Sequence, residues 1–445
     1  MSRLLEYLQR FIPAPQEWFG DVAVMPEQQA VEALECTSYK DLVDHWSDTR
    51  NKPGGKPGAL FWSDQIDIGF SAMLATSAST LQQGAQIFLR VISPPGGVKT
   101  TLCEAMLANP GYTYPMSIST GFHSGQEGNH LFHLMNGKTV IWNEADTLLS
   151  SPHKDQILSH MRDHWSGNIR ASYRNGVRYE IKGLRTTYIL AGTATVRKLN
   201  RSSAGDRFLD VIIYERKVKG GADENEIELL DRVAQMAITR TRAISGETLD
   251  SQDDQYKVLA IRKTVGYINW LRSNAPKLLE TVDIPLKAVA ECRSMAQLVA
   301  YMRARPDEKA DDDETEVELG TRLTEQLVRM AMCLAVVLGK PAVDVEVMRR
   351  VATIANHTCR GKTLQVCQIL KDKRCDRNRL VALTGWTPDT VSKQLGILEA
   401  IGCIRQDKKV TAAGVVGSRQ GVYTLSPQVS GLISKMQSMM FPRGK

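Results

Sequence analysis

The strongest restriction on the fold is an apolar strand that runs directly into a glycine-rich turn and then a helix. Residues 86–92 (QIFLRVI) predict a buried strand, and residues 102–107 (LCEAML) predict a helix. The segment between them, Ser93 to Thr101, reads SPPGGVKTT. A turn in this position directs backbone N–H groups and the positive end of a helix toward one point, which suits a phosphate group. The segment therefore predicts a phosphate-binding loop in an α/β fold.

The side chains of this loop suit ATP with its magnesium ion. We expect Lys99 to neutralise the β- and γ-phosphate oxygens and the Thr100 hydroxyl to ligate Mg²⁺. The pattern G-x-x-x-x-G-K-[ST] is broken twice, because Ser93 replaces the first glycine and Val98 the second. A Pro/Gly turn that happens to precede Lys-Thr-Thr is the alternative. The residues expected to bind ATP are Pro95, Gly96, Gly97, Val98, Lys99, Thr100 and Thr101.

A second apolar strand carries polar groups at its carboxyl end. Residues 139–142 (TVIW) lead into Asn143 and Glu144, and parallel α/β sheets bind ligands at this end of their strands. We expect Glu144 to polarise the attacking water and Asn143 to order the hydrated Mg²⁺ through its side-chain carbonyl oxygen. Aspartate is usual at the position of Asn143, so the neutral amide should weaken metal binding. The alternative for Glu144 is an ordinary acid at a helix N-terminus.

Apolar strands alternate with helical segments through the first half of the chain. A third strand is expected at 186–191 (TTYILA), and the helices are expected at about 64–80, 100–108 and 153–165. From about 224 to 355 the periodicity is helical, apart from an acidic stretch that we expect to be a solvated loop. The predicted domains are an N-terminal helical and linker segment (1–60), an α/β ATPase core (61–222), a helical lid (223–358) and a winged-helix domain (359–445).

Composition argues against several other classes of protein. No apolar run reaches the roughly 18 residues that span a bilayer, and the N-terminal segment carries charges where a signal peptide is apolar. The eight cysteines of the 445-residue chain form no C-x-x-C pair, which argues against a disulfide framework and a zinc finger. We therefore expect a cytoplasmic protein with no membrane partner, associated with the nucleoid or acting in a phage-infected cell.

The net charge of +7 is unevenly distributed along the chain. From Arg360 to Lys445 there are 15 basic and five acidic residues, a net of +10, so the other 359 residues total −3. A basic segment on a nearly neutral body predicts binding to a polyanion such as DNA. Simple solubility is the alternative explanation.

The loop and the second strand together make the chain similar to an AAA+ ATPase, and its later motifs resemble replicative helicases of the minichromosome-maintenance (MCM) type and related phage or plasmid proteins. The resemblance covers roughly residues 64–440. It implies that Thr193, after the third strand, is the polar sensor-1 residue, and that Arg207 reaches the nucleotide of a neighbouring subunit. It further implies that Arg322 is the sensor-2 arginine of the lid, in cis or in trans. Residues 1–60 are too few for the N-terminal DNA collar of a full MCM protein.

A basic hairpin is expected between the second and third strands. In residues 169–181 (IRASYRNGVRYEI), a three-residue loop at 174–176 pairs Ile169 with Ile181 and Ala171 with Tyr179. This register places all the apolar side chains on one face, whereas a two-residue Asn-Gly turn would mix the faces. In the resembling helicases such a hairpin grips DNA in a central channel. The DNA-binding residues predicted here are Arg170, Arg174 and Arg178, and an ordinary surface hairpin is the alternative.

The last 80 or so residues predict a winged helix-turn-helix. Helices are expected at 364–370, at 377–384 and from Pro388, which Thr387 caps, and strands at 403–405 and 421–425 complete a wing. Within the third helix Val391, Leu395 and Leu398 form the expected buried stripe. We expect Lys393 to lie near a DNA groove and Lys408 and Lys409 to contact phosphates. Protein binding is the alternative for this domain.

Taken together, these features predict an ATP- and Mg²⁺-dependent AAA+ motor that forms a ring, expected to be a hexamer, and acts as a DNA helicase. Two alternatives remain open at this point. The first is a remodelling ATPase of the MoxR type, whose loops also lack the glycine before the lysine. The second is a DNA-binding regulator or loader that binds nucleotide at the Asn143 site without hydrolysing it.

Overall fold

The computed structural model describes residues 31–50, 54–60, 62–82, 84, 86–96, 98–116, 131–172, 178–201, 207–213, 252–304, 320–359, 361–407 and 421–441. The chain divides into two compact units. Unit 1 comprises Met1–Gly205, Ile212–Thr281 and Val336–Gly339, and unit 2 comprises Asp206–Val211, Val282–Ala335 and Lys340–Lys445.

The main sheet has five parallel strands in the order β2-β3-β6-β1-β7. Their bounds are β1 Phe88–Ile92, β2 Thr113–Met116, β3 Thr139–Trp142, β6 Thr187–Gly192 and β7 Phe208–Ile212. Strands β1, β3 and β6 confirm the three apolar runs predicted from the sequence, and all their residues are buried. Strands on which both faces are covered read as continuous apolar runs rather than alternating ones. Strands β2 and β7 were not predicted.

Helices α3 (Asp64–Ser79), α4 (Lys99–Leu107) and α6 (Lys154–Ser166) of unit 1 confirm the predicted helical segments. Helix α3 begins at Ser63, whose hydroxyl accepts a hydrogen bond from the Ile66 N–H at 3.2 Å. All residues of α3 from Ile68 onward are buried, as expected for a helix that is apolar on every side.

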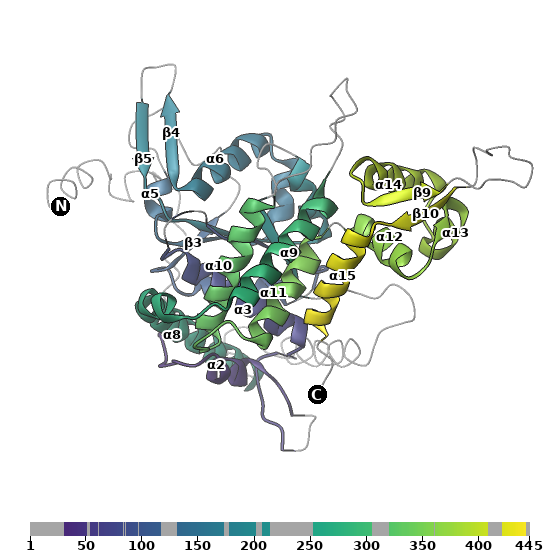
Figure 1. The fold of residues 1–445 in the computed structure, drawn as a ribbon. Helices are drawn as coiled ribbons and strands as arrows, with labels where there is room; N and C mark the ends of the chain where they lie inside the picture. The colour runs from purple at the N-terminus through teal and green to yellow at the C-terminus, as the bar shows by residue number, and fades with distance from the viewer. Residues whose placement is uncertain are drawn as a thin grey trace, which may run out of the picture. The chain divides into compact units, whose positions relative to one another are not determined.

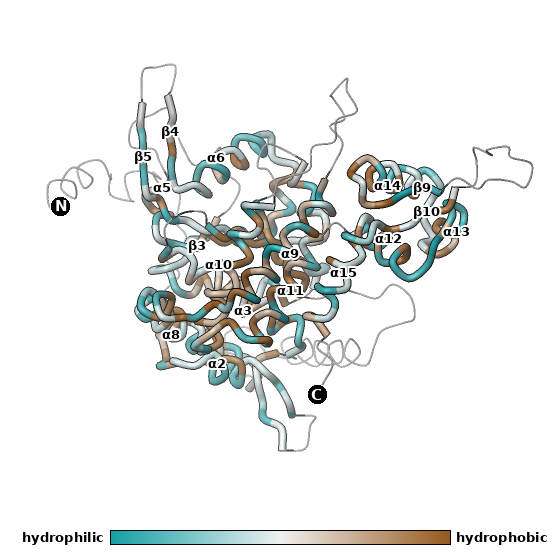
Figure 2. Tube along the Cα trace, viewed as in Figure 1, coloured by the Kyte–Doolittle hydropathy of each residue, from teal (hydrophilic) through white to brown (hydrophobic). Residues whose placement is uncertain are grey.

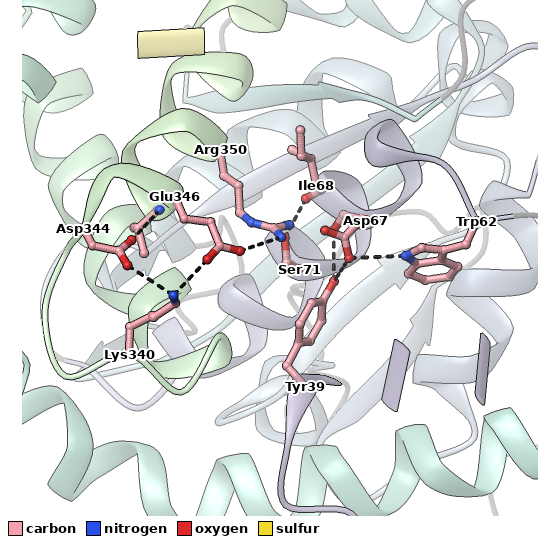
Figure 3. Close-up of polar contacts among 10 residues, drawn as sticks. Tyr39, Trp62, Asp67, Ile68, Ser71, Lys340, Asp344, Glu346 and Arg350 are labelled. Atoms are coloured by element: carbon pink, nitrogen blue, oxygen red, sulfur yellow. Dashed lines mark hydrogen bonds and ion pairs between the residues drawn. The ribbon is translucent and has the colours of Figure 1, made fainter. Parts of the chain in front are cut away.

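The remaining helices of unit 1 are α2 (Tyr39–Trp46), α5 (Phe132–Met135) and α8 (Gln252–Thr281), with 3-10 helices η2 (Ala145–Ser150) and η3 (Ala194–Arg201). Helix α2 packs on α8, and the Trp46 indole N–H donates to the Thr264 hydroxyl at 3.0 Å. In the first turn of α3, the Asp67 carboxylate accepts hydrogen bonds from Tyr39 at 2.9 Å and Trp62 at 3.3 Å (Figure 3). These contacts attach the segment before the sheet to the core of unit 1.

Strands β4 (Asn168–Ser172) and β5 (Arg178–Lys182) form the predicted antiparallel hairpin (Figure 1). Ile169 pairs with Ile181 and Ala171 with Tyr179, which is the register required by a three-residue loop. The register derived from the apolar face is therefore confirmed, and the two-residue turn is wrong. The loop itself, with Arg174, lies outside the described residues.

Unit 2 contains the helices α9 (Leu286–Arg303), α10 (Thr321–Val337) and α11 (Val345–Thr358). Figure 2 shows hydrophobic stretches along all three, and in α10 the buried Leu323, Leu327, Met330 and Leu334 follow helical spacing. The start of α11 is fixed by the Asp344 carboxylate, which accepts from the Val347 N–H at 3.0 Å. The Lys340 ammonium lies 3.2 Å from Asp344 and 2.9 Å from Glu346 (Figure 3), and its hydrogen bond lowers the pKa of the Glu346 carboxyl.

The C-terminal part of unit 2 contains helices α12 (Gly361–Asp372), α13 (Arg377–Thr384) and α14 (Pro388–Ala400), gathered near a small sheet (Figure 1). The sheet is antiparallel, with β8 (Cys375–Asp376), β9 (Ile404–Asp407) and β10 (Val422–Leu425) in the order β8-β10-β9. The three helices and the two longer strands were predicted; β8 was not. The stripe of Val391, Leu395 and Leu398 is buried as predicted.

A last helix, α15 (Pro427–Met440), was not predicted. Its start is fixed by Ser426, whose hydroxyl accepts from the Val429 N–H at 3.4 Å. The helix packs against α9 and α11, and the Lys435 ammonium donates to the Ser294 hydroxyl at 3.0 Å. Helix α15 therefore connects the small helix-and-sheet module to the longer helices of unit 2.

Candidate functional site

Three neighbouring parallel strands of unit 1 end side by side. Strand β6 lies between β1 and β3, with Gly192 opposite Ile92 and Leu190 opposite Trp142. The pairing continues past the strands, because the Ser93 N–H donates to the Gly192 carbonyl and the Glu144 N–H donates to the Ala191 carbonyl, both at 3.1 Å. The phosphate-loop segment, the acidic segment and the segment after β6 therefore meet at one edge of the sheet.

The loop after β1 leads directly into the N-terminus of α4. Ser93 is buried, and its hydroxyl donates to the Pro94 carbonyl at 3.0 Å. Gly96 has a φ of 77°, a conformation that L side chains rarely adopt. Helix α4 begins at Lys99 after Val98, and among the described residues no side chain makes a capping hydrogen bond to its first N–H groups. An uncapped helix start at the end of a sheet is available to an anion.

The lysine of the loop is held inside it. The Lys99 side chain is 7% exposed, and its ammonium donates to the Pro94 carbonyl at 3.4 Å. Pro95 and Gly96 are exposed, whereas Val98, Thr100 and Thr101 are half-buried. Gly97 lies outside the described residues. The loop thus keeps its cation beside the backbone that leads into the helix.

Glu144 has a strained backbone. Its φ of 74° and ψ of 48° are left-handed, and it is the only non-glycine residue of the described part of the chain with a positive φ. Its side chain is exposed and makes no hydrogen bond or ion pair with a described residue. Such strain costs about 1–3 kcal/mol and gathers at functional sites. The geometry holds a carboxylate at the sheet edge at the expense of stability.

The neighbouring Asn143 has an unsatisfied oxygen. Its side-chain Oδ1 is buried and accepts no hydrogen bond from a described residue. A buried acceptor without a partner costs about 1–3 kcal/mol, and buried polar groups in folded proteins are normally paired. An unpaired oxygen at the end of a parallel strand suits a ligand that supplies a hydrogen-bond donor or a cation.

Thr193 is fixed by Asp146, a residue to which no role was assigned from the sequence. The Asp146 carboxylate accepts from the Thr193 N–H at 2.7 Å and from the Thr193 hydroxyl at 3.2 Å, and it also accepts from the Thr195 hydroxyl. A Cβ added at Gly192 would lie 3.1 Å from this carboxylate, so glycine allows the close approach. The segments after β3 and β6 are therefore joined through one carboxylate.

The oxygen-rich side chains at this edge fit a hydrated magnesium ion. Mg²⁺ takes oxygen ligands, keeps several waters and is usually held by one or two protein groups together with substrate phosphates. The Thr100 hydroxyl and the unpaired Asn143 oxygen are ligands of this kind. Across the part of the chain that is described, no group of three or more His, Cys, Asp and Glu side chains could hold a metal ion.

The two predicted arginines belong to unit 2, so they are not among the groups that unit 1 brings together. Arg322 is exposed in the first turn of α10. One turn later, the buried Gln326 side chain donates to the Arg207 carbonyl at 2.6 Å. The backbone of Arg207 is thus attached to the helix that carries Arg322.

The predicted DNA-binding residues are only partly described. Arg170 lies on β4 opposite Glu180, and Arg178 lies on β5 opposite Ser172. Lys393 is exposed on α14. Arg174, Lys408 and Lys409 lie outside the described residues.

No family model matches the chain, and no curated protein shows significant sequence similarity to it. No helix among the described residues combines the length and the apolar character needed to cross a membrane.

Proposed function

We propose that the chain is an AAA+ ATPase that forms a ring and uses ATP hydrolysis to move on DNA as a helicase, with a C-terminal winged helix. The observation that carries this proposal is the meeting of Lys99, Asn143, Glu144 and Thr193 at the ends of three adjacent parallel strands. Phosphoryl transfer depends mainly on positioning and on electrostatic stabilisation, and these residues supply a cation, a carboxylate and polar oxygens.

Each residue has a distinct task in this mechanism. Lys99 and the N-terminal N–H groups of α4 bind the phosphates of ATP. Thr100 and Asn143 would hold the ion, and Mg²⁺ when bound neutralises negative charge on the phosphate oxygens. The unpaired Glu144 carboxylate accepts a hydrogen bond from the attacking water and orients it. Thr193, fixed by Asp146, contacts the γ-phosphate or that water.

Arg207 and Arg322 would complete the site around the γ-phosphate. An arginine at this position contributes about 10³–10⁵ in rate, because the transition state spreads charge over the phosphate oxygens. If Arg207 comes from a neighbouring subunit, the contacts are head-to-tail, and a closed ring satisfies every site. The β4–β5 hairpin and the C-terminal module supply the basic groups for DNA.

The neutral Asn143 favours a second candidate, a DNA-binding regulator or loader that binds ATP without hydrolysing it. An amide oxygen attracts Mg²⁺ less strongly than the carboxylate usual at this position, so the ion could be held too weakly for efficient turnover.

Glu144→Gln separates the candidates. The variant keeps the size of the side chain but removes the negative charge, so we expect ATP to remain bound while turnover falls at least about 10²-fold. Turnover and bound nucleotide are measured with and without DNA. Glu280→Gln, a change of an exposed residue of α8, is the control and should leave both unchanged.

Three other outcomes would decide against the motor. Equal slow turnover by the wild type and Glu144→Gln would favour the regulator. Turnover that depends on Glu144 but is indifferent to DNA would favour a remodelling ATPase of the MoxR type. Absence of ATP binding by the wild type would remove the whole proposal.

A further inference from the structure

Among the described residues of the C-terminal module, the largest group of basic side chains lies before and within the first turn of α13. Residues 371–379 contain five basic and two acidic residues, whereas α14 contains one lysine and two acids. Helix α14 is the element expected to enter a DNA groove, yet it carries net negative charge. The charge that attracts a polyanion therefore lies elsewhere in the described part of the module.

Four of these basic residues face solvent and form what is called here the α13 basic cluster: Lys373, Arg374, Arg377 and Arg379. None of the four makes an ion pair with a described residue. Two other charged residues of the segment 371–379, Lys371 and Asp376, make hydrogen bonds. The Lys371 ammonium donates to the Gln437 side chain at 2.6 Å, and the Asp376 carboxylate caps α13 by accepting from the Arg379 N–H at 2.8 Å.

The local fold exposes these basic residues around one buried cysteine. Cys375 is buried between the basic residues, so the alternation of a strand turns Arg374 and Asp376 outward. Strand β8 is at the edge of its sheet, and Tyr423 of β10 pairs with Cys375. Burial and then the Glu399 carboxylate raise the pKa of Tyr423, while the Arg377 guanidinium opposes them. Arg377 therefore lies within electrostatic range of the sheet.

We propose that the α13 basic cluster, and not the face of α14, is the main contact of this module with the phosphate backbone of DNA. This inference rests on the proposed function, because it assumes that the chain binds DNA. The segment from Lys373 to Arg377 spans roughly 13 Å at about 3.3 Å per residue. The four long basic side chains on a segment of this length can reach at most about four phosphates, one for each cation.

The chemistry of the cluster fits a nucleic acid better than an acidic protein. Three of the four residues are arginines, whose planar guanidinium pairs with phosphate through two hydrogen bonds. Protein interfaces are centred on buried aromatic or aliphatic residues, and the segment 373–379 exposes no apolar side chain. A contact made only of phosphate pairs positions a protein on DNA without reading its sequence.

The test is the salt dependence of DNA binding by the full-length chain. A labelled duplex of mixed sequence is titrated at several salt concentrations, for the wild type and for the variant Lys373→Ala/Arg374→Ala/Arg377→Ala/Arg379→Ala. Each lost phosphate contact removes about 0.9 from the slope of log affinity against log salt. We therefore expect the slope to fall by up to about 3.6, and the affinity at low salt to fall about tenfold or more.

Three further variants serve as controls. Lys40→Ala/Lys277→Ala/Lys287→Ala/Arg293→Ala removes the same charge from exposed positions outside the module and should leave the slope nearly unchanged. Arg374→Lys/Arg377→Lys/Arg379→Lys keeps the charge and should keep most of the slope. Lys393→Ala should lower the slope by about 1 at most. Thermal melting of each variant checks that it is folded.

The failure of this inference can be distinguished from the failure of the proposed function. If the wild type binds no duplex even at low salt, the DNA-binding function is wrong. If the wild type binds DNA and the cluster variant binds it with the same slope, the inference alone is overturned, and an acidic protein becomes the better partner. A larger loss in Lys393→Ala than in the cluster variant would assign the contact to α14.

Discussion

At the scale of single residues, the backbone of Glu144 links stability to the proposed activity. A left-handed conformation costs an L-residue about 1–2 kcal/mol, and glycine avoids most of this cost because it has no Cβ. Glu144 has this conformation with a φ of 74°. We expect Glu144→Gly to raise the free energy of unfolding by about 1 kcal/mol and to abolish ATP hydrolysis. Urea denaturation and steady-state turnover measure the two effects.

Glu144→Ala is the matched control, because alanine also lacks the carboxylate but keeps the Cβ. It should lose hydrolysis without gaining the stability of the glycine variant. Equal free energies of unfolding for the glycine and alanine variants would show that the left-handed backbone stores no strain. Activity retained in either variant would instead remove the carboxylate from the mechanism.

At the scale of elements, His160 makes the stability of unit 1 sensitive to acid. His160 lies on α6, and burial lowers its pKa from 6.5 to about 4. Between these two values the unfolded chain binds a proton at this histidine that the folded chain does not. The free energy of unfolding therefore falls as the pH is lowered through this window, and the contribution is fully present only above pH 6.5.

Replacement of His160 by asparagine removes this titration. We expect the free energy of unfolding of His160→Asn, measured by urea denaturation from neutral pH to about pH 4, to depend less on pH than that of the wild type. Other groups contribute equally to both proteins, so the difference isolates His160. Identical pH dependence of the two proteins would contradict the lowered pKa.

The elements that could be predicted from the sequence are those whose own residues determine them. Strands β3 and β6 are short apolar runs buried on both faces. The start of α14 can be recognised from the capping residue Thr387 and from Pro388 at the first helical position. Strand β2 could not be recognised, because it contains Pro115 and lies at the edge of the sheet, where a missing N–H is tolerated. Strand β7 contains the buried Asp210, which opposes strand propensity.

The residues of the candidate site also fall into two groups, those that a local sequence pattern indicates and those that depend on tertiary contacts. Lys99 and Glu144 could be proposed from the sequence because each follows a recognisable strand. The role of Asp146 was not found, since it depends on Thr193 and Thr195, 47 and 49 residues further along the chain. The unpaired oxygen of Asn143 and the left-handed backbone of Glu144 are likewise features of the folded structure. No local pattern encodes a tertiary contact of this kind.

Within unit 2, the segment that carries Arg207 is held by three helices. Gln326 of α10 donates to the Arg207 carbonyl, Arg303 of α9 donates to the Phe208 carbonyl, and the Asp210 N–H donates to Thr358 of α11 at 2.9 Å. A movement of these helices must therefore move the backbone of Arg207. If Arg207 acts on a neighbouring subunit, this attachment gives each subunit a means of influencing the next.

At the scale of the whole molecule, the proposed ring predicts complementation between two inactive variants. Arg207→Ala would inactivate the ATP site of the neighbouring subunit, whereas Glu144→Gln would inactivate the ATP site of the subunit that carries it. In rings assembled from an equal mixture, about one interface in four combines an intact Glu144 with an intact Arg207. We therefore expect DNA-stimulated ATP turnover to recover to about a quarter of the wild-type rate.

The control mixes Glu144→Gln with Lys99→Ala. Both changes affect the same half of the site, so no interface is intact and ATP turnover should not recover. Recovery in the control, or none in the first mixture, would contradict an arginine supplied by the neighbouring subunit.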